Sequence, residues 1–362
     1  MTGFTLGRYF FMRYIALTFW FFIGSAAIIF IVSFTEISGQ IGGLVENSTR
    51  MALTIAALQT PMIMQQAVPF IGLISGIVAL VALNRKYELV VVRAAGISAW
   101  QFLMPICLGA FTFGVVTLLV LNPLASMGLE RAQALEVEAH AGNNVPDTQP
   151  SAPWIKQRTD EGETIIGAQT TINQGLEIVG ATFLRIGEDG QISERLDAER
   201  AYLRNGYWEL INVKRFRGGS SPDSLDTTRI GTNLLPEYVM ERLVRPEIIP
   251  IYDLPRKIDA ARSFGVRANA FATHFHSLVA LPALLVTMAL IAATVSMRFA
   301  RMGQSTTIIL GGVLAGFLLY VVSVLVKAFG SAGLVPPVIA AWLPVVVAGF
   351  FGVTFLLYKE DG

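Results

Sequence analysis

Six long apolar segments divide this 362-residue chain, three before a polar block and three after it. A helix that crosses the hydrocarbon core of a bilayer needs about 20 apolar residues, and each segment reaches or approaches that length. The polar block runs from Asn122 to Arg267 and is large enough to form a domain. The pattern predicts a polytopic α-helical membrane protein with six transmembrane helices, arranged 3+3 around an inserted domain. The segments are Phe10–Phe34, Ile55–Leu83, Ala99–Leu121, Ala270–Met297, Thr307–Phe329 and Pro336–Tyr358.

The composition supports this class of protein and excludes others. Hydrophobic residues make up 53% of the chain and charged residues 15%, and the mean hydropathy is +0.57. The net charge of +1 provides no overall field for nucleic acid. A disulfide framework is excluded because Cys107 is the single cysteine. The first apolar segment follows Arg8 and Arg13 and has no cleavage-site pattern, so it is expected to be a retained span.

Basic residues in short loops predict the orientation, because they stay on the cytoplasmic side. They occur in the N-terminal flank, after the second and fourth segments and in the C-terminal flank, which all lie on one side. The basic residues are Arg8, Arg13, Arg85, Lys86, Arg93, Arg298, Arg301 and Lys359. On the other side, Glu36 and Glu46 outnumber Arg50, and residues 330–336 carry no charge. Both termini are therefore expected to be cytoplasmic and the central domain to lie on the outer face.

The polar block has the pattern of a β domain between residues 153 and 216. Short runs rich in β-branched and aromatic residues are separated by turn signals. The clearest signal is Asn205-Gly206, which predicts a two-residue hairpin turn. A β-sandwich or jelly roll is the expected form. The predicted strands are 154–158, 164–166, 176–186, 191–196 and 207–216.

Helices are expected on both sides of this β domain. Leu124–His140 should extend the third span outward, and Pro146–Pro153 should be a linker. On the far side, a capping residue and a proline in the first turn predict a short helix at Leu254–Phe264. The predicted organisation is 1–122 for the first three transmembrane helices, 123–267 for the β domain with its flanking helices, and 268–362 for the last three.

Motifs for catalysis and for nucleotide or metal binding are absent from the sequence. No Gly-Lys pair occurs, so the chain has no P-loop and is expected not to hydrolyse ATP alone. No His-Glu-x-x-His motif occurs, and His274 and His276 are two residues apart, on different faces of a helix. We expect these histidines at the outer interface of the membrane. No catalytic residue, cofactor or metal is predicted.

The loop between the second and third spans, residues 84–98, is too regular for a simple turn. One helical face would consist of Tyr87, Val91 and Ala94-Ala95, with Glu88 and Val92 alongside. Gly96 is a natural stop for such a helix. A short surface helix ending at a glycine suits a membrane subunit that contacts a soluble motor protein. An interfacial helix without a partner would give the same pattern.

This segment carries a resemblance to a known family. Glu88-Leu-Val-Val-Val-Arg93-Ala-Ala-Gly96-Ile-Ser98 resembles the E-x-x-x-x-R-A-x-G-[IV]-S signature of the LptF/LptG (YjgP/YjgQ) permeases, the membrane subunits of the lipopolysaccharide exporter. Weaker similarities follow in family order, so the resemblance covers essentially the whole chain. They are Trp154–Arg158, Asp197–Ala201 with Trp208-Glu-Leu, and Phe275–Pro282. The short outer domain and the opening Arg-Tyr-Phe are more similar to the LptG branch than to the LptF branch.

The resemblance implies six transmembrane helices and a periplasmic β-jelly-roll domain in a bacterial inner membrane protein. It implies a heterodimer with an LptF-like sister permease, bound to a dimer of an LptB-like cytoplasmic ABC ATPase. The complex would extract lipopolysaccharide from the inner membrane and pass it to an LptC/LptA-like periplasmic bridge. Glu88 matches the acidic residue of the family's coupling helix, which docks in a groove of the ATPase. Tyr87, Arg93 and Gly96 belong to the same coupling segment.

Lys327 and the interior of the β domain are the candidate lipid-binding elements. A lysine within a span is a functional candidate by default. The lipid A phosphates would be its partner, and snorkelling to the nearby outer interface is the alternative. Acyl chains would pass along the apolar β interior, although alternation alone does not fix which face points inward. The expected inward residues are Ile166, Ile178, Phe183 and Trp208.

The sequence departs from the family at the outer end of the first span. Family members often carry basic residues there, whereas this chain reads Phe34-Thr-Glu36-Ile. Phosphate recognition at that position would then fall to the partner subunit.

Two other functional classes are consistent with a membrane protein of this size. A mechanotransmission subunit of another ABC system would typically have four spans with its domain after the first, which the 3+3 layout disfavours. A membrane-embedded lipid-modifying enzyme would need clustered Asp, Glu and His at one membrane face, and the sequence has no such cluster.

Overall fold

The computed structural model describes the helices, the strands and many of the connections between them. The described residues are 4–41, 48–141, 154–159, 162–168, 170–172, 176–187, 191–204, 206–217, 222–233, 246–263, 268–297 and 306–360. The predicted linker Pro146–Pro153 and the basic residues Arg298 and Arg301 lie outside these ranges.

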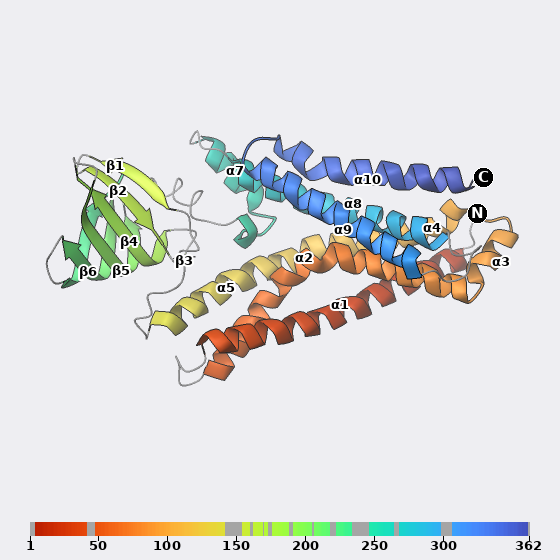
Figure 1. Ribbon diagram of the computed structural model, residues 1–362, viewed down its shortest axis with the longest axis horizontal. Helices are drawn as coiled ribbons and strands as arrows, with labels where there is room; N and C mark the ends of the chain where they lie inside the picture. The colour runs from red at the N-terminus through yellow and green to blue at the C-terminus, as the bar shows by residue number, and fades with distance from the viewer. Residues whose placement is uncertain are drawn as a thin grey trace.

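Within the described residues, six helices are long and apolar enough to cross a membrane, which confirms the predicted 3+3 arrangement (Figure 1). The third span begins as α4, passes through a π-helical turn, η1, and continues into α5, so its predicted extension as a helix beyond Leu121 is confirmed. The helices are α1 (Phe4–Ile41), α2 (Ser48–Arg85), α4 (Ala99–Val116), η1 (Thr117–Leu121), α5 (Asn122–Ala141), α8 (Asn269–Met297), α9 (Thr306–Ser331) and α10 (Pro337–Glu360).

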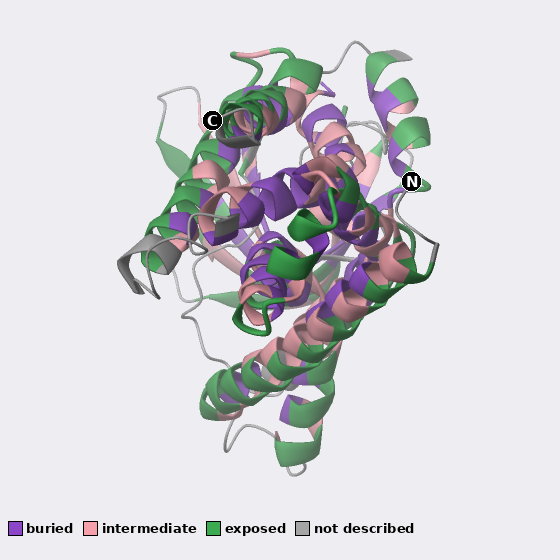
Figure 2. Ribbon diagram, turned by 90° about the vertical axis from the view of Figure 1, so that its right-hand side faces the viewer, coloured by how far each residue is buried: buried purple, intermediate pink, exposed green. Residues whose placement is uncertain are grey.

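The helices α2 and α8 form the centre of the bundle. In their most apolar parts, 61% of α2 and 67% of α8 is buried, against 6% of α1 and 17% of α9. Figure 2 shows the buried residues gathered on the central helices. Close packing attaches α1 to this centre and to α4: the fully buried Tyr14 donates from its hydroxyl to the carbonyl of Gly72 of α2 at 3.4 Å, and a Cβ added at Gly109 of α4 would lie 2.8 Å from its ring. The exposed apolar faces of α1 and α9 are suited to contact lipid or a second membrane subunit.

Elements at the end of the bundle near the β domain connect the spans to this domain. The helix α5 packs along α2, and Gln59 donates a hydrogen bond to Glu136 at 2.5 Å. Asn122 accepts a hydrogen bond from the backbone N–H of Ile251 at 2.9 Å, close to the single turn η3 (Pro246–Ile248). The amphipathic helix α7 (Leu254–Ser263) follows, as predicted for residues 254–264.

The inserted domain is one antiparallel sheet whose strands follow one another in sequence order (Figure 1). The order is β1-β2-β4-β5-β6-β7, and the short β3 pairs with the beginning of β4. The strands are β1 (Ile155–Thr159), β2 (Gly162–Gly167), β3 (Thr170–Ile172), β4 (Glu177–Ile186), β5 (Ile192–Arg204), β6 (Tyr207–Arg217) and β7 (Asp223–Gly231).

The predicted hairpin and the predicted inward residues both agree with this sheet. Arg204 pairs with Tyr207, so two residues form the turn, and Gly206 has a φ of 82°, the left-handed conformation that glycine adopts without strain. The side chains of Ile166, Ile178, Phe183 and Trp208 are fully buried in one apolar cluster.

The sheet curls strongly enough for its first strand to meet the end of its last. Gln157 of β1 accepts a hydrogen bond from the hydroxyl of Thr232 at 2.5 Å and donates one to the carbonyl of Gly231 at 3.2 Å. In the described residues β1 forms a backbone ladder with β2 and β7 with β6, and side-chain contacts join the two edges. The inserted β domain expected from the sequence is therefore confirmed, as a curled sheet with an apolar interior.

Candidate functional site

A short helix at the end of the bundle opposite the β domain is the first candidate site (Figure 1). It is α3 (Glu88–Ala94), which two residues separate from the end of α2 at Arg85. Tyr87, which precedes it, has a φ of 58°, and Gly96, which follows it, has a φ of 78°. The N–H of Gly96 donates to the carbonyl of Arg93 at 3.0 Å. Left-handed residues on both sides give the helix sharp ends.

The two faces of α3 have different surroundings. Leu89 and Val92 are buried against the bundle core. Tyr87 and Val91 are 72% and 67% exposed, and Val90 is also exposed. Several large apolar side chains that lie together at a surface outside the apolar spans often mark an interaction site. The exposed face of α3 is therefore a candidate docking surface for a protein partner.

The carboxylate of Glu88 contacts the first span. It accepts hydrogen bonds from the hydroxyl of Tyr9 at 3.0 Å and from Nη1 of Arg13 at 3.3 Å. Arg13 also donates to the hydroxyl of Tyr9, and its guanidinium lies 5.7 Å from the centre of that ring. The side chains of Arg13 and Glu88 are 20% and 29% exposed. Sequence reasoning missed this contact, because 75 residues separate its two partners.

Lys327 lies on the side of α9 that faces the bundle. It is half-buried, and Ser323 and Gly330, one turn away on either side, are buried. Gly330 packs so closely on α8 that an added Cβ would lie 3.0 Å from Oγ1 of Thr273. Since α8 and α9 run in opposite directions, Lys327 lies level with the first turns of α8 after Thr273.

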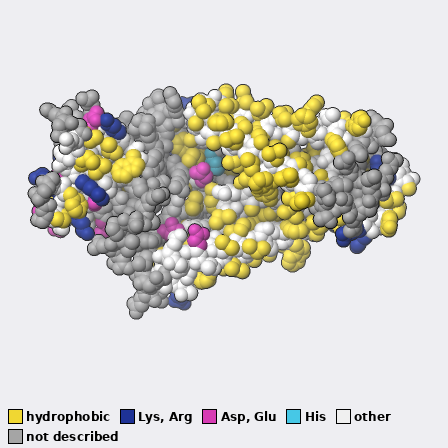
Figure 3. All heavy atoms as spheres, viewed as in Figure 1, with side chains coloured by type: hydrophobic (Ala, Val, Ile, Leu, Met, Phe, Trp, Pro, Cys, Tyr) yellow, Lys and Arg dark blue, Asp and Glu magenta, His cyan; other side chains and the backbone are white. Residues whose placement is uncertain are grey.

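Several polar side chains meet at this level. Oγ1 of Thr273, Nε2 of His274 and Oγ of Ser277 are buried and have no hydrogen-bond partner among the described residues. Glu247 of η3 and Lys327 are the charged neighbours of His274. Toward the β domain, the apolar surface of the bundle includes a histidine and an acidic side chain (Figure 3). Buried polar groups without partners are rare and often mark a site for water, an ion or a ligand.

A metal is a poor fit to this cluster. In the described part of the chain, no group of three or more His, Cys, Asp or Glu side chains is arranged to hold one. A lysine and two hydroxyls are instead groups that donate hydrogen bonds to an anion.

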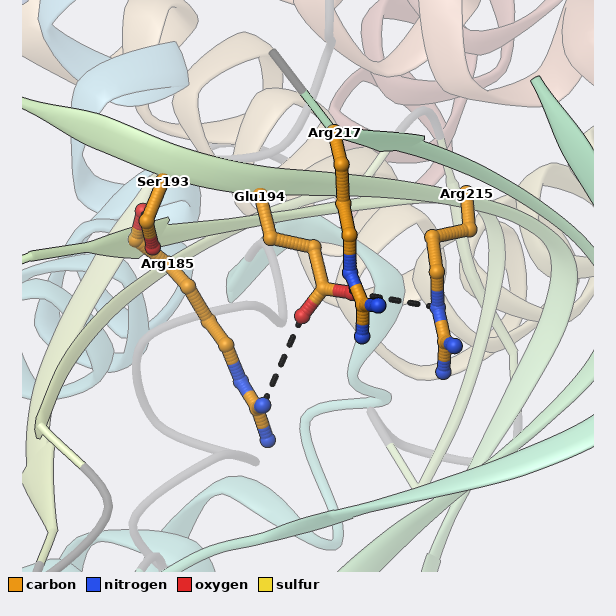
Figure 4. A network of polar contacts seen from close by, with 5 residues as sticks. All are labelled: Arg185, Ser193, Glu194, Arg215 and Arg217. Atoms are coloured by element: carbon orange, nitrogen blue, oxygen red, sulfur yellow. Dashed lines mark hydrogen bonds and ion pairs between the residues drawn. The ribbon is translucent and has the colours of Figure 1, made fainter. Parts of the chain in front are cut away.

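The β interior provides the third candidate site. Phe183 and Trp208 lie edge to face, with ring centres 6.1 Å apart. At one end of this interior, three arginines surround Glu194, a network that sequence reasoning also missed. Arg185 contacts one carboxylate oxygen at 3.4 Å, and Arg215 and Arg217 contact the other at 3.0 and 3.1 Å (Figure 4).

Together these features define a class of protein: a multi-pass helical membrane protein with an inserted β domain and a short surface helix at the opposite end of the bundle. Comparison with known proteins identifies the family. The chain matches "Lipopolysaccharide export system permease LptF/LptG" over residues 8–359 and belongs to that family.

Two curated relatives are the lipopolysaccharide export system permease proteins LptG of Escherichia coli K12 and of Escherichia coli O6:H1 strain CFT073. Each is 23% identical to this chain over 313 residues, which is 83% of both lengths. The expected similarity to the LptG branch agrees with these relatives.

Proposed function

We propose that this protein is the transmembrane permease subunit of an ABC-type lipopolysaccharide exporter, which extracts lipopolysaccharide from the inner membrane and passes it to a periplasmic bridge. The observation that carries the proposal is the family match over residues 8–359, in a chain that presents a docking helix at one end and a β domain at the other. The protein itself is non-catalytic, and a partner ATPase supplies the energy.

The proposed topology places α3 and both termini in the cytoplasm and the β domain in the periplasm. Arg85, Lys86 and Arg93 around α3 are exposed, and Arg8 lies at the same end of α1, which supports this orientation by the positive-inside rule. Glu36, at the opposite end of α1, is on the acidic side.

Docking on the ATPase dimer is assigned to the coupling segment. Tyr87 and Val91 supply the apolar contact area, and Glu88 supplies a charge-assisted hydrogen bond. Gly96 ends the helix and allows the chain to turn into α4. Arg93, in the last turn of α3, provides a positive charge for the same partner.

Lipid binding is assigned to two regions of the chain. Lys327, with the hydroxyls of Thr273 and Ser277 nearby, would bind a phosphate of lipid A at the outer end of the bundle. The apolar interior around Ile166, Phe183 and Trp208 would then receive acyl chains. Burying a charged lysine here without an anion would cost roughly several kcal/mol of free energy, so a bound phosphate would stabilise the charged form.

Reconstitution tests the proposed function directly. The protein would be placed in liposomes with its sister permease and its ATPase dimer, and release of lipopolysaccharide to an added bridge protein would be measured. We expect release that requires ATP and all subunits, and no ATP hydrolysis by this chain alone. Release that continues without this chain would refute the assignment, and hydrolysis by the isolated chain would contradict its non-catalytic role.

A further inference from the structure

The three arginines around Glu194 lie in one row across neighbouring strands. Arg185 of β4 is directly opposite Glu194 of β5, and Glu194 is directly opposite Arg217 of β6. Arg215 is two residues earlier on β6, so its side chain points to the same face. The side chain of Glu194 is only 8% exposed. We name Arg185, Arg215 and Arg217, with Glu194 at their centre, the arginine collar.

The collar faces the apolar interior. Strand side chains two residues apart share a face, and three of the four collar residues are two residues from a buried apolar one, while Arg217 is two residues from Arg215. Phe183, Leu196 and Val213, the neighbours of Arg185, Glu194 and Arg215, are all at most 2% exposed. The collar therefore continues the lining of the interior and forms its polar end. The other end of β4, where β3 pairs with it, lies toward α5.

The collar holds three guanidinium groups around one carboxylate. Glu194 accepts contacts from all three arginines. Asp223 of β7 is opposite Arg215 in the register. Arg215 and Arg217 contact Glu194 through Nε, and in Figure 4 the terminal nitrogens of Arg215 point away from the carboxylate.

We propose that the arginine collar is a binding site for a phosphate group of an acylated lipid whose chains lie against the β interior. Guanidinium groups match phosphate oxygens with two parallel hydrogen bonds, and an apolar surface next to them suits the acyl chains. Glu194 is a positioning residue that holds the three guanidinium groups in one place. The proposal rests on the proposed function, because it requires that lipid reaches this domain.

The test compares two lipids that differ in phosphate alone. The full chain, in its complex with the sister permease and ATPase, would carry a photo-crosslinking amino acid at Leu225, which is half-buried against the interior. Lipid A and its dephosphorylated form would be supplied in nanodiscs, with ATP, and crosslinked lipid would be measured by mass spectrometry. The variant Arg215→Gln/Arg217→Gln tests the collar, and Arg215→Lys/Arg217→Lys keeps its charge without the paired hydrogen bonds.

The matched control is Arg204→Gln, because Arg204 pairs with Glu209 at 3.3 Å on the opposite face of the sheet. We expect the double glutamine variant to crosslink lipid A on the order of tenfold less than wild type, with unchanged crosslinking of the dephosphorylated lipid. The lysine variant should lie between the two, and Arg204→Gln should match wild type.

Three results would overturn the proposal, and they differ in what they imply. Equal losses for both lipids in the glutamine variant would make the collar a structural support. If the double glutamine variant crosslinks lipid A as strongly as wild type does, the phosphate binds elsewhere. If wild type crosslinks neither lipid, lipid does not reach this domain. That result would refute both the collar proposal and the proposed binding of acyl chains in the β interior.

Discussion

Glu88 of the surface helix α3 and Arg13 of the first span form an ion pair, with Nη1 of Arg13 3.3 Å from a carboxylate oxygen. The proposed ATPase-docking residue is therefore attached to α1, one of the two spans with the least buried surface. Movement of α3 by the ATPase would pull on α1 through this contact and through Tyr9, whose hydroxyl donates to the same carboxylate at 3.0 Å. This arrangement gives the coupling segment a direct contact with a span whose apolar surface is mostly exposed.

The first prediction concerns this connection. Arg13→Gln should leave the complex assembled and the ATPase active while lowering the amount of lipopolysaccharide released per ATP. A partly exposed ion pair contributes about 0.2–1 kcal/mol to stability, so unfolding should change little. ATP hydrolysis and lipid release would be measured in the same liposomes, with Arg8→Gln, an exposed arginine one turn earlier on α1, as control. An unchanged ratio of release to hydrolysis would mean that the pair does not transmit motion.

The second prediction separates the internal role of Glu88 from docking. Glu88→Arg would remove the proposed contact with the ATPase and would also place two positive charges together. Binding of the ATPase should weaken by about 2–5 kcal/mol if the proposed contact is an interfacial charge pair, so assembly should be lost. The exchange Glu88→Arg with Arg13→Glu restores the internal ion pair. Copurification of the ATPase would be measured for both variants. We expect it to be lost in both if Glu88 docks directly, whereas recovery in the exchange variant would assign Glu88 to the internal contact alone.

Local sequence patterns predicted the helices and strands of this protein well, but they did not predict its polar contacts. The six spans and the Asn205-Gly206 hairpin depend on length, composition and turn chemistry, which a sequence displays directly. The strand β7 was missed because it is a polar edge strand whose one buried apolar side chain is Ile230. The strand β5 was predicted to end at Leu196 but continues to Arg204, because small alanines at its buried positions give a weak β signal.

The polar sites depend on contacts that no local pattern contains. The pair Arg13–Glu88 joins two helices that are far apart in the chain. The arginine collar requires the register of three strands, and a shift of one residue would move its side chains to the other face. For Lys327 the sequence left open two environments, and the structure places it on the bundle-facing side of α9.

The third prediction tests Lys327 as a phosphate ligand. Lys327→Ala should weaken lipopolysaccharide binding by the purified complex about 10- to 100-fold, the effect of losing a hydrogen bond to a charged group. Lys327→Glu should be worse because it repels phosphate, and Lys327→Arg should be partly tolerated. The control is Ser323→Ala on the same face of α9, because that hydroxyl donates to the carbonyl of Leu319 at 2.8 Å. Normal binding and transport by Lys327→Glu would identify the lysine as an interfacial anchor and transfer phosphate recognition to the partner subunit.

The fourth prediction concerns access to the β interior. In the described part of the sheet, Phe183 and Trp208 are fully buried at the centre, so we expect lipid entry to require the sheet to open. Side-chain contacts between Gln157 and Thr232 join β1 to the end of β7, whereas backbone ladders join β1 to β2 and β6 to β7, so we expect the sheet to open between β1 and β7. Gln157→Cys with Thr232→Cys, in a Cys107→Ala background, would allow a short, reducible thiol crosslinker to close this boundary.

We expect the closed form to keep normal ATP hydrolysis while crosslinking of lipopolysaccharide to the photo-reactive residue at Leu225 falls strongly. Reduction of the thiol crosslinker should restore crosslinking of lipopolysaccharide at Leu225, because the sheet can then open again. Each single cysteine variant treated with the same reagent controls for chemical modification at that position. If lipid reaches Leu225 equally well in the closed form, the chains enter by another edge, and the short strand β3, which pairs with β4 over three residues, becomes the place to close next.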